Sequence, residues 1–371
     1  MGAKPIDIGL QTLLNGSRGC GRFLHKAMVM LAIPMGECSM KTANLMLRML
    51  GCAIAGTCAQ AAAATSVATL DTLAPEMVND AAVMTPVQAG DKGAAVLRAQ
   101  ILLDRARFSP GELDAAYGSN MRQAIVGFQA SRGLPVSGTM DAATWAALGG
   151  DSAPVLVSMT LGAADVTGPF RPLPSGMMAR SKLDALGYSS SLEALGEKFH
   201  ASPALLQQLN PGSDFGRAGE QLVVPAVEAV TPMPGVAKVL VDKSDSTVSL
   251  LDEAGKVVAQ YPASTGSEHD PLPIGDWKIK GVGKNPVFRY NPKLFWDAKA
   301  KDARATLAAG PNNPVGVVWV DLSMDHYGIH GTPEPSKVGK TESHGCIRLT
   351  NWSALELSQA VKPGMTATLQ E

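Results

Sequence analysis

The period of the hydrophobic pattern changes along this chain, and this change limits the fold more than any other feature. From about residue 86 to residue 150 apolar side chains recur at helical spacing, whereas from Val236 onward they alternate with polar ones, as in strands. A chain of 371 residues also exceeds one compact core. We therefore expect a multidomain α+β protein with a small three-helix bundle, a further small unit and a mostly β, sandwich-like or barrel-like domain.

The N-terminal segment has the form of a secretory signal peptide. A second possible start, Met40, is followed by the positive charges of Lys41 and Arg48, an apolar run, and the small-residue sequence Ala59-Gln60-Ala61, which fits a cleavage site. We therefore expect export to the periplasm, with a cytoplasmic extension before a signal anchor as the alternative. The expected segments are a misassigned upstream extension (1–39), the signal peptide (40–61) and a linker (62–85).

The positions of the cysteines follow from that expectation. Cys346 is the only cysteine beyond the signal segment. An exported protein with one thiol has no internal disulfide, and the thiol becomes a candidate reactive group. A lipoprotein attached through Cys52 is a weaker alternative, because the preceding residues match a lipid-attachment signal poorly. The cysteines in or before the signal segment are Cys20, Cys38, Cys52 and Cys58.

The first compact unit is expected over residues 86–150. Its apolar residues predict three short helices, the last from Asp141 to Leu148 with Asp141 as the N-cap. The segment AAYGSNMRQAIVGFQASRGLPVSGTMDAATWAAL resembles the peptidoglycan-binding domain with a three-helix core. A role in packing alone is the alternative, and the resemblance does not indicate which residues contact a ligand. The residues that mark the helices are Val96, Ile101, Leu102, Met121, Ile125, Phe128, Gln129, Trp145 and Leu148.

A proline- and glycine-rich connector is expected over residues 151–187, followed by a small unit over residues 188–226. Two helices and a closing strand in this unit resemble a divergent LysM module, a βααβ glycan-binding fold. The step Leu209-Asn210-Pro211 carries the likeness. A purely structural spacer is the alternative. His200 is interpreted as a surface or packing histidine.

The C-terminal segment contains the residues that carry chemistry, in the sequence YGIHGTPEPSKVGKTESHGCIRLTN. A free thiol is mostly protonated at neutral pH, and a nearby imidazole that removes its proton makes a strong nucleophile. His330 can serve Cys346 in this way if strand 328–331 lies beside the turn at Gly345. Glycine permits a tight turn there, and its backbone N–H groups suit an oxyanion hole. The residues alone thus predict a thiol acyl-transfer enzyme.

Two other interpretations of this cluster stay open. His326, His330, His344 and Cys346 are residue types that bind zinc, although no CxxC or HExxH spacing supports a metal site. In the second interpretation, Cys346 is an inert buried thiol, as many free cysteines are. The formal net charge of −1 and the lack of a basic stripe exclude a typical nucleic-acid binder.

The motif IHGT…SHGCIRL resembles the active-site signature of the L,D-transpeptidase family, with the YkuD-type catalytic domain expected over residues 236–370. The sequences STG at 264–266 and PIGDWKI at 273–279 support the likeness. The resemblance implies a role for each matching position. Cys346 is the nucleophile, His330 the base, the Gly331 carbonyl orients the imidazole, His344 and Gly345 form the oxyanion-side turn, and Ser343 and Arg348 bind substrate. For Arg348 a structural ion pair is the alternative.

The same resemblance implies a reaction without metal or organic cofactor. Cys346 attacks the L,D bond of a peptidoglycan tetrapeptide stem, D-Ala leaves, and the acyl group passes to an acceptor. A second stem gives a 3→3 cross-link, a lysine of an outer-membrane lipoprotein gives an anchor, and water gives an L,D-carboxypeptidase or hydrolase. Acylation by carbapenems is implied as well. A non-catalytic wall-binding scaffold is the alternative from another class. We expect a lid between Asn285 and Asn313, where Pro, Asn and Lys cluster.

Overall fold

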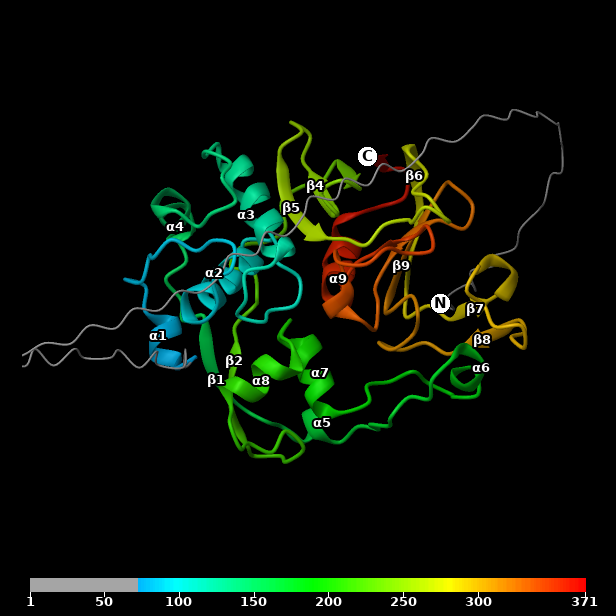
Figure 1. Cartoon of the computed structure of the whole chain (residues 1–371), viewed down its shortest axis with the longest axis horizontal. Coiled ribbons are helices and arrows are strands. Elements are labelled where there is room, and N and C mark those ends of the chain that lie inside the picture. The colour runs from blue at the N-terminus through cyan, green and yellow to red at the C-terminus, as the bar shows by residue number, and fades with distance from the viewer. Residues whose placement is uncertain (1–72) are drawn as a thin grey trace, which may run out of the picture. The chain divides into compact units, whose positions relative to one another are not determined.

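The structure is a computed structural model that describes residues 73–371 (Figure 1). The predicted upstream extension, the signal peptide and residues 62–72 of the predicted linker therefore lie outside the described residues. Among the helices from residue 73 onward, none combines the length and apolar character needed to cross a membrane.

The predicted three-helix bundle is confirmed. Its helices are α2 (Ala94–Arg105), α3 (Ser119–Arg132) and α4 (Ala142–Leu148). Asp141 caps α4, since its Oδ1 accepts a hydrogen bond of 2.8 Å from the N–H of Thr144. All nine residues that marked the helices in the sequence are buried, because they form the inward stripe of each helix.

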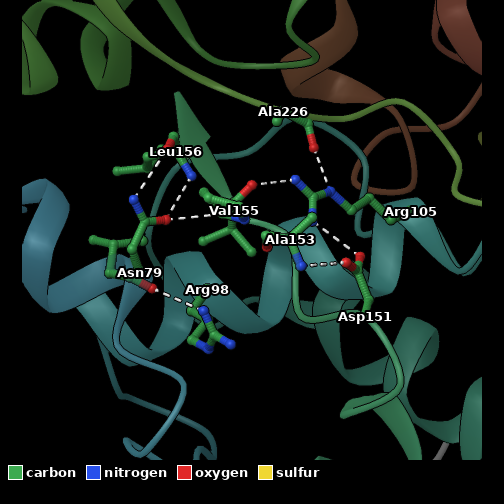
Figure 2. Close-up of polar contacts among 10 residues, drawn as sticks. Asn79, Arg98, Arg105, Asp151, Ala153, Val155, Leu156 and Ala226 are labelled. Carbon is green, nitrogen blue, oxygen red and sulfur yellow. Dashed lines mark hydrogen bonds and ion pairs between the residues drawn. The ribbon is translucent and has the colours of Figure 1, made fainter. Parts of the chain in front are cut away.

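A fourth helix, α1 (Pro75–Asn79), occupies part of the predicted linker. Proline suits the first turn of a helix, and Val78 is buried against the bundle. The amide of Asn79 accepts hydrogen bonds of 2.9 Å from the N–H groups of Val155 and Leu156 (Figure 2). The end of the predicted linker is thus part of the fold and fastens the next unit.

The βααβ unit begins earlier than the sequence indicates. Its opening strand β1 (Leu156–Thr160) lies in the predicted connector and pairs antiparallel with β2 (Gln221–Pro225). Leu156 is the only fully buried residue of β1, so alternation gives little signal there. The helices between the strands are α5 (Ala163–Val166), α6 (Met177–Arg180), α7 (Ser191–Lys198) and α8 (Pro203–Leu209).

A buried arginine fastens this unit to helix α2. The guanidinium of Arg105 forms an ion pair of 2.9 Å with Asp151 and donates to the carbonyls of Pro154 and Ala226 (Figure 2). Its side chain is 4% exposed, and these partners offset the cost of burying its charge. Both ends of the βααβ unit are therefore held at one place on the bundle.

The C-terminal region contains one mixed eight-stranded sheet with the order β11-β10-β9-β6-β12-β3-β4-β5. A hairpin turn at 252–255 joins β4 to β5, with Gly255 at φ +78°. Apolar residues from strands along the whole sheet share one core with helix α9 (Asn351–Ala360), so the sheet curls around that helix (Figure 1). The strands are β3 (Lys238–Asp242), β4 (Thr247–Leu251), β5 (Val257–Pro262), β6 (Gly275–Lys284), β9 (Val318–Leu322), β10 (Gly328–His330), β11 (Ile347–Arg348) and β12 (Thr366–Gln370).

The helical bundle covers the β5 edge of this sheet. The N–H of Gln260 donates to the carbonyl of Arg107, and the carbonyl of Gln260 accepts from Ser109, which continues the sheet pairing by one bridge. The Gln260 side chain also donates to the carbonyl of Gln123 on α3 at 2.8 Å. A covered edge has no unpaired backbone groups left for another chain.

Candidate active site

The register of β10 and β11 brings the predicted catalytic residues together. These strands are parallel, with Ile329 opposite Ile347 and His330 opposite Arg348. Paired side chains lie on the same face, and the face repeats every second residue. Cys346, two residues before Arg348, therefore shares a face with His330, while both isoleucines point into the core at 0% exposure. This strand pair therefore places the imidazole and the thiol on the same face of the sheet.

The turn before the nucleophile is closed by its own side chains. The hydroxyl of Ser343 donates a hydrogen bond of 2.5 Å to the carbonyl of Cys346, and the N–H of Ser343 donates to Thr265 at 2.8 Å. Gly345 has φ +93°, and an added Cβ would lie 3.0 Å from the Tyr327 ring. Ser343, which was predicted to bind substrate, thus uses its hydroxyl inside the turn. Glycine is required at position 345 because φ is positive there and because a side chain would collide with Tyr327.

His330 is held in one tautomer. Its Nδ1 lies 2.6 Å from the carbonyl oxygen of Gly331, which can only accept, so Nδ1 carries the proton. The neutral ring then has an unprotonated Nε2 that can receive a proton. Trp319 stacks on the imidazole with ring centroids 5.5 Å apart, and the side chain is 4% exposed. The predicted role of the Gly331 carbonyl therefore has its geometric basis here.

The imidazole and the thiol are both neutral at rest. Burial lowers the pKa of His330 to about 4, and the Arg348 charge acts in the same direction. Burial raises the pKa of Cys346 to about 11. The thiol proton is directed at the carbonyl of His326, with Sγ and oxygen 3.5 Å apart. A neutral thiol becomes a strong nucleophile only as it loses its proton. A base beside the thiol must therefore take that proton during attack.

The Gly331 segment is supported from helices α9 and α7. A Cβ at Gly331 would lie 2.2 Å from Asn351 Oδ1, so only glycine fits there. Asn351 accepts from the N–H of Val317 at 3.2 Å and donates to the carboxyl of Glu197 at 3.0 Å. Burial raises the pKa of Glu197 to about 8, so its carboxyl is largely protonated at neutral pH. A continuous set of contacts therefore runs from the βααβ unit to the residue that orients His330.

Two charged side chains near the thiol have a buried polar atom without a hydrogen-bond partner within residues 73–371. These atoms are Nε of Arg348 and Oδ2 of Asp270. The terminal nitrogen of Arg348 donates to the carbonyl of Glu342. A buried polar atom without a partner costs about 1–3 kcal/mol. These two atoms are therefore positions where the polar groups of a ligand would bind favourably.

The segment expected to form a lid reaches the catalytic turn. It contains the short strands β7 (Phe288–Tyr290) and β8 (Ala305–Leu307). His344 Nε2 lies 3.1 Å from Asp297 Oδ1, and the ring of His344 stacks on Trp296 at 5.7 Å. Trp296 is 63% exposed. The segment thus contacts the nucleophile turn through His344 and presents an aromatic surface beside it.

The zinc interpretation gains no support from the geometry. In the part of the chain from residue 73 onward, no three His, Cys, Asp or Glu side chains are placed to hold a metal ion together. His330 instead binds a backbone carbonyl and His344 an aspartate.

Comparisons with known proteins identify two regions of the chain. Residues 237–369 match the family model of the L,D-transpeptidase catalytic domain, and residues 92–148 match that of a peptidoglycan binding domain. A Bacillus licheniformis protein assigned as the L,D-transpeptidase YkuD is 30% identical over 181 residues, which cover 48% of this chain and 93% of that protein. The chain belongs to the L,D-transpeptidase family. Both resemblances predicted from the sequence are confirmed, whereas the LysM-like resemblance of 188–226 stays a prediction.

More distant members of the family show lower similarity. The Escherichia coli K12 protein assigned as L,D-transpeptidase YbiS is 24% identical over 184 residues, which cover 48% of this chain and 59% of that protein. The crystal structure of an L,D-transpeptidase from Xylanimonas cellulosilytica is 17% identical, covers 76% of this chain and 97% of that one, and superposes with a TM-score of 0.33.

The sequence analysis missed the residues that surround the catalytic pair. Tyr327 lies within the motif, but only the fold shows that its ring packs on Gly345. Asn351 is the last residue of the same motif, yet its contact with Glu197 spans 154 residues. Asp270 belongs to a loop without a strong pattern. A carboxylate in the run SEHDPLP was the only available signal, and it did not distinguish Asp270 from Glu268.

Proposed function

We propose that this L,D-transpeptidase family member uses Cys346 to form a thioester with a peptidoglycan tetrapeptide stem. The single observation that carries the proposal is the strand pair that sets His330 and Cys346 on one face, with Nδ1 of His330 committed to Gly331. Nε2 takes the thiol proton as sulfur attacks the carbonyl carbon, and gives it to the departing D-Ala amine. The N–H groups of the turn at Gly345 stabilise the oxyanion.

Arg348 binds the carboxylate at the end of the donor stem in this proposal. Its Nε is buried and unpartnered within the described residues, and guanidinium groups bind carboxylates with two parallel hydrogen bonds. D-Ala carries such a carboxylate, next to the bond that breaks. Its departure removes one charge from the Arg348 side of the site and leaves the thioester ready for an acceptor.

The acyl group then passes to an acceptor amine on another stem, which gives a 3→3 cross-link. The bundle at 92–148 holds the enzyme on the wall polymer and raises the local concentration of stems. The βααβ unit supports the active site, because the carboxyls of Glu193 and Glu197 on α7 bind Asn312 and Asn351 of the catalytic region. The periplasm is the compartment where this substrate occurs, and we propose it as the location.

The test is covalent labelling followed by intact-mass measurement. The protein is incubated with a carbapenem beside a Cys346→Ala variant, with thermal unfolding as the control for folding. One adduct on the wild type and none on the variant is expected, because the thioester needs the thiol. A folded wild-type protein that takes up no adduct would overturn the proposal. Release of D-Ala from a tetrapeptide stem, lost in the same variant, then establishes the donor.

A further inference from the structure

The loop from Ser264 to Leu272 pairs with the catalytic turn at its start. Ser264 and Arg348 form an antiparallel bridge, and Gly266 and Ser343 form a parallel one. A Cβ at Gly266 would lie 2.3 Å from the carbonyl oxygen of Asp270, so the loop folds back tightly on itself. The N–H of Ser267 donates to the carbonyl of Asp270 at 3.0 Å, and the N–H of Asp270 donates to the Ser267 hydroxyl at 3.2 Å, so Asp270 is held close to the paired part of the loop.

The side chain of Asp270 has an unsatisfied oxygen in this position. Its Oδ2 is buried and has no hydrogen-bond partner among residues 73–371, even though the loop around it is fixed. The neighbouring carbonyl of Pro271 lies 3.5 Å from the hydroxyl of Tyr327, the residue that packs on Gly345. A buried carboxylate oxygen without a donor is costly, which favours a ligand that brings one.

Two side chains of opposite charge act on the thiol. Burial is the largest cause of the raised pKa of Cys346; the positive charge of Arg348 opposes this rise and the negative charge of Asp270 adds to it. Since the reaction joins a carboxyl donor to an amine acceptor, each of the two charges suits one substrate.

We propose that the carboxylate of Asp270 forms the subsite for the acceptor, and that it binds a primary ammonium group next to the Cys346 thioester. This inference rests on the proposed function. The acceptor enters as an ammonium ion and loses one proton to solvent before attack. Its nitrogen forms a bond to the thioester carbonyl carbon, the C–S bond breaks, and the second nitrogen proton passes through His330 to the sulfur. Asp270 stabilises the positive charge that develops on nitrogen during attack.

The experiment separates acylation from transfer. The donor is a tetrapeptide stem whose side-chain amine is acetylated, so that it cannot act as acceptor, and D-Ala release reports acylation. The acceptors are a tripeptide stem with a free side-chain amine, which is cationic, and hydroxylamine, which is neutral at neutral pH. Mass spectrometry gives the ratio of amine product to hydrolysis product for each acceptor. The proteins are the wild type, Asp270→Asn, and Asp325→Asn as a matched control, since the Asp325 side chain is 89% exposed.

We expect Asp270→Asn to lower the product ratio for the stem acceptor by about 10- to 100-fold, as for a lost charged hydrogen bond. D-Ala release and transfer to hydroxylamine should persist, and Asp325→Asn should match the wild type. An unchanged ratio, an equal fall for both acceptors, or a wild type that yields only hydrolysis product would overturn the subsite. A wild type that releases no D-Ala would overturn the proposed function itself, which is a different result.

Discussion

Two regions of the protein bury polar side chains, and they differ in whether those side chains have partners. Where the helical bundle, the βααβ unit and the catalytic region meet, buried polar groups have partners: Arg107 pairs with Glu356 at 2.8 Å, and Nδ1 of His200 lies 2.7 Å from Oδ2 of Asp104. Around the thiol, atoms of Asp270 and Arg348 have no partner within the described chain. The first pattern stabilises the fold, whereas the second leaves sites for a substrate.

One interface atom departs from this rule. Nε1 of Trp352 is buried without a partner in the described part of the chain, while its ring stacks on His200 at 4.9 Å. The stacking itself connects α9 to the βααβ unit. His200, interpreted from the sequence as a surface or packing histidine, is therefore a contact between three parts of the molecule: Asp104 of the bundle, its own unit, and α9.

The largest effect should come from removing the base in the unpaired region. We expect His330→Gln to slow acylation by about 10²- to 10⁴-fold near neutral pH, because general-base catalysis is lost and the thiol stays protonated. With pKa values of about 4 for His330 and about 11 for Cys346, the wild-type rate should be flat between these limits. The variant rate should rise with pH as the thiol ionises. Carbapenem adduct formation across this pH range provides the measurement.

Two results would contradict that expectation. A wild-type acylation rate that increases with pH around neutrality would indicate a thiolate–imidazolium pair at rest rather than two neutral groups. A variant whose rate does not recover at high pH would show that His330 does more than remove the proton. Matching thermal unfolding of the two proteins is the control for folding.

The catalytic pair could be predicted from sequence because its signal is local. Cys346, His330 and the glycines beside them lie within 17 residues, and the three helices of the bundle each follow one period. Strand β1 could not be found in this way, since only one of its five residues, Leu156, is buried. Asn351 and Glu197 are 154 residues apart in the sequence, and a contact between such distant residues produces no periodic pattern in either segment.

A smaller effect, on stability rather than chemistry, is expected in the paired region. Arg107→Ala leaves the Glu356 carboxylate with Tyr261 alone, and removal of one partner of a buried pair costs about 3 kcal/mol. Chemical unfolding should show this loss, while acylation of the folded variant stays near the wild-type rate. Arg217→Ala is the matched control, because its partner Glu220 is three residues away and Arg217 is exposed, so no measurable change is expected. Loss of acylation in a folded Arg107→Ala variant would contradict the distinction between a region that stabilises the fold and a region that binds substrate.

The last effect, a dependence of stability on pH, is expected where the two regions join, at Glu197. Its pKa of about 8 in the folded protein lies above the ordinary value of 4.5, so between these values the folded state holds a proton that the unfolded state has released. Stability therefore falls as pH rises through this window, by at most about 1.4 kcal/mol per pH unit. Glu197→Gln keeps an oxygen for Asn351 but cannot ionise, so part of that slope should disappear.

Unfolding free energies at several pH values between 5 and 8 measure this slope, with Glu253→Gln on the exposed β4–β5 hairpin as the matched control. Acylation should change only a few-fold in Glu197→Gln, because a single neutral hydrogen bond contributes about 1 kcal/mol. An unchanged slope would show that the carboxyl is ionised against Asn351 in the folded protein. A large loss of acylation at constant stability would instead show that Glu197 acts on the active site. Its contact with Asn351 would then position Gly331 and His330.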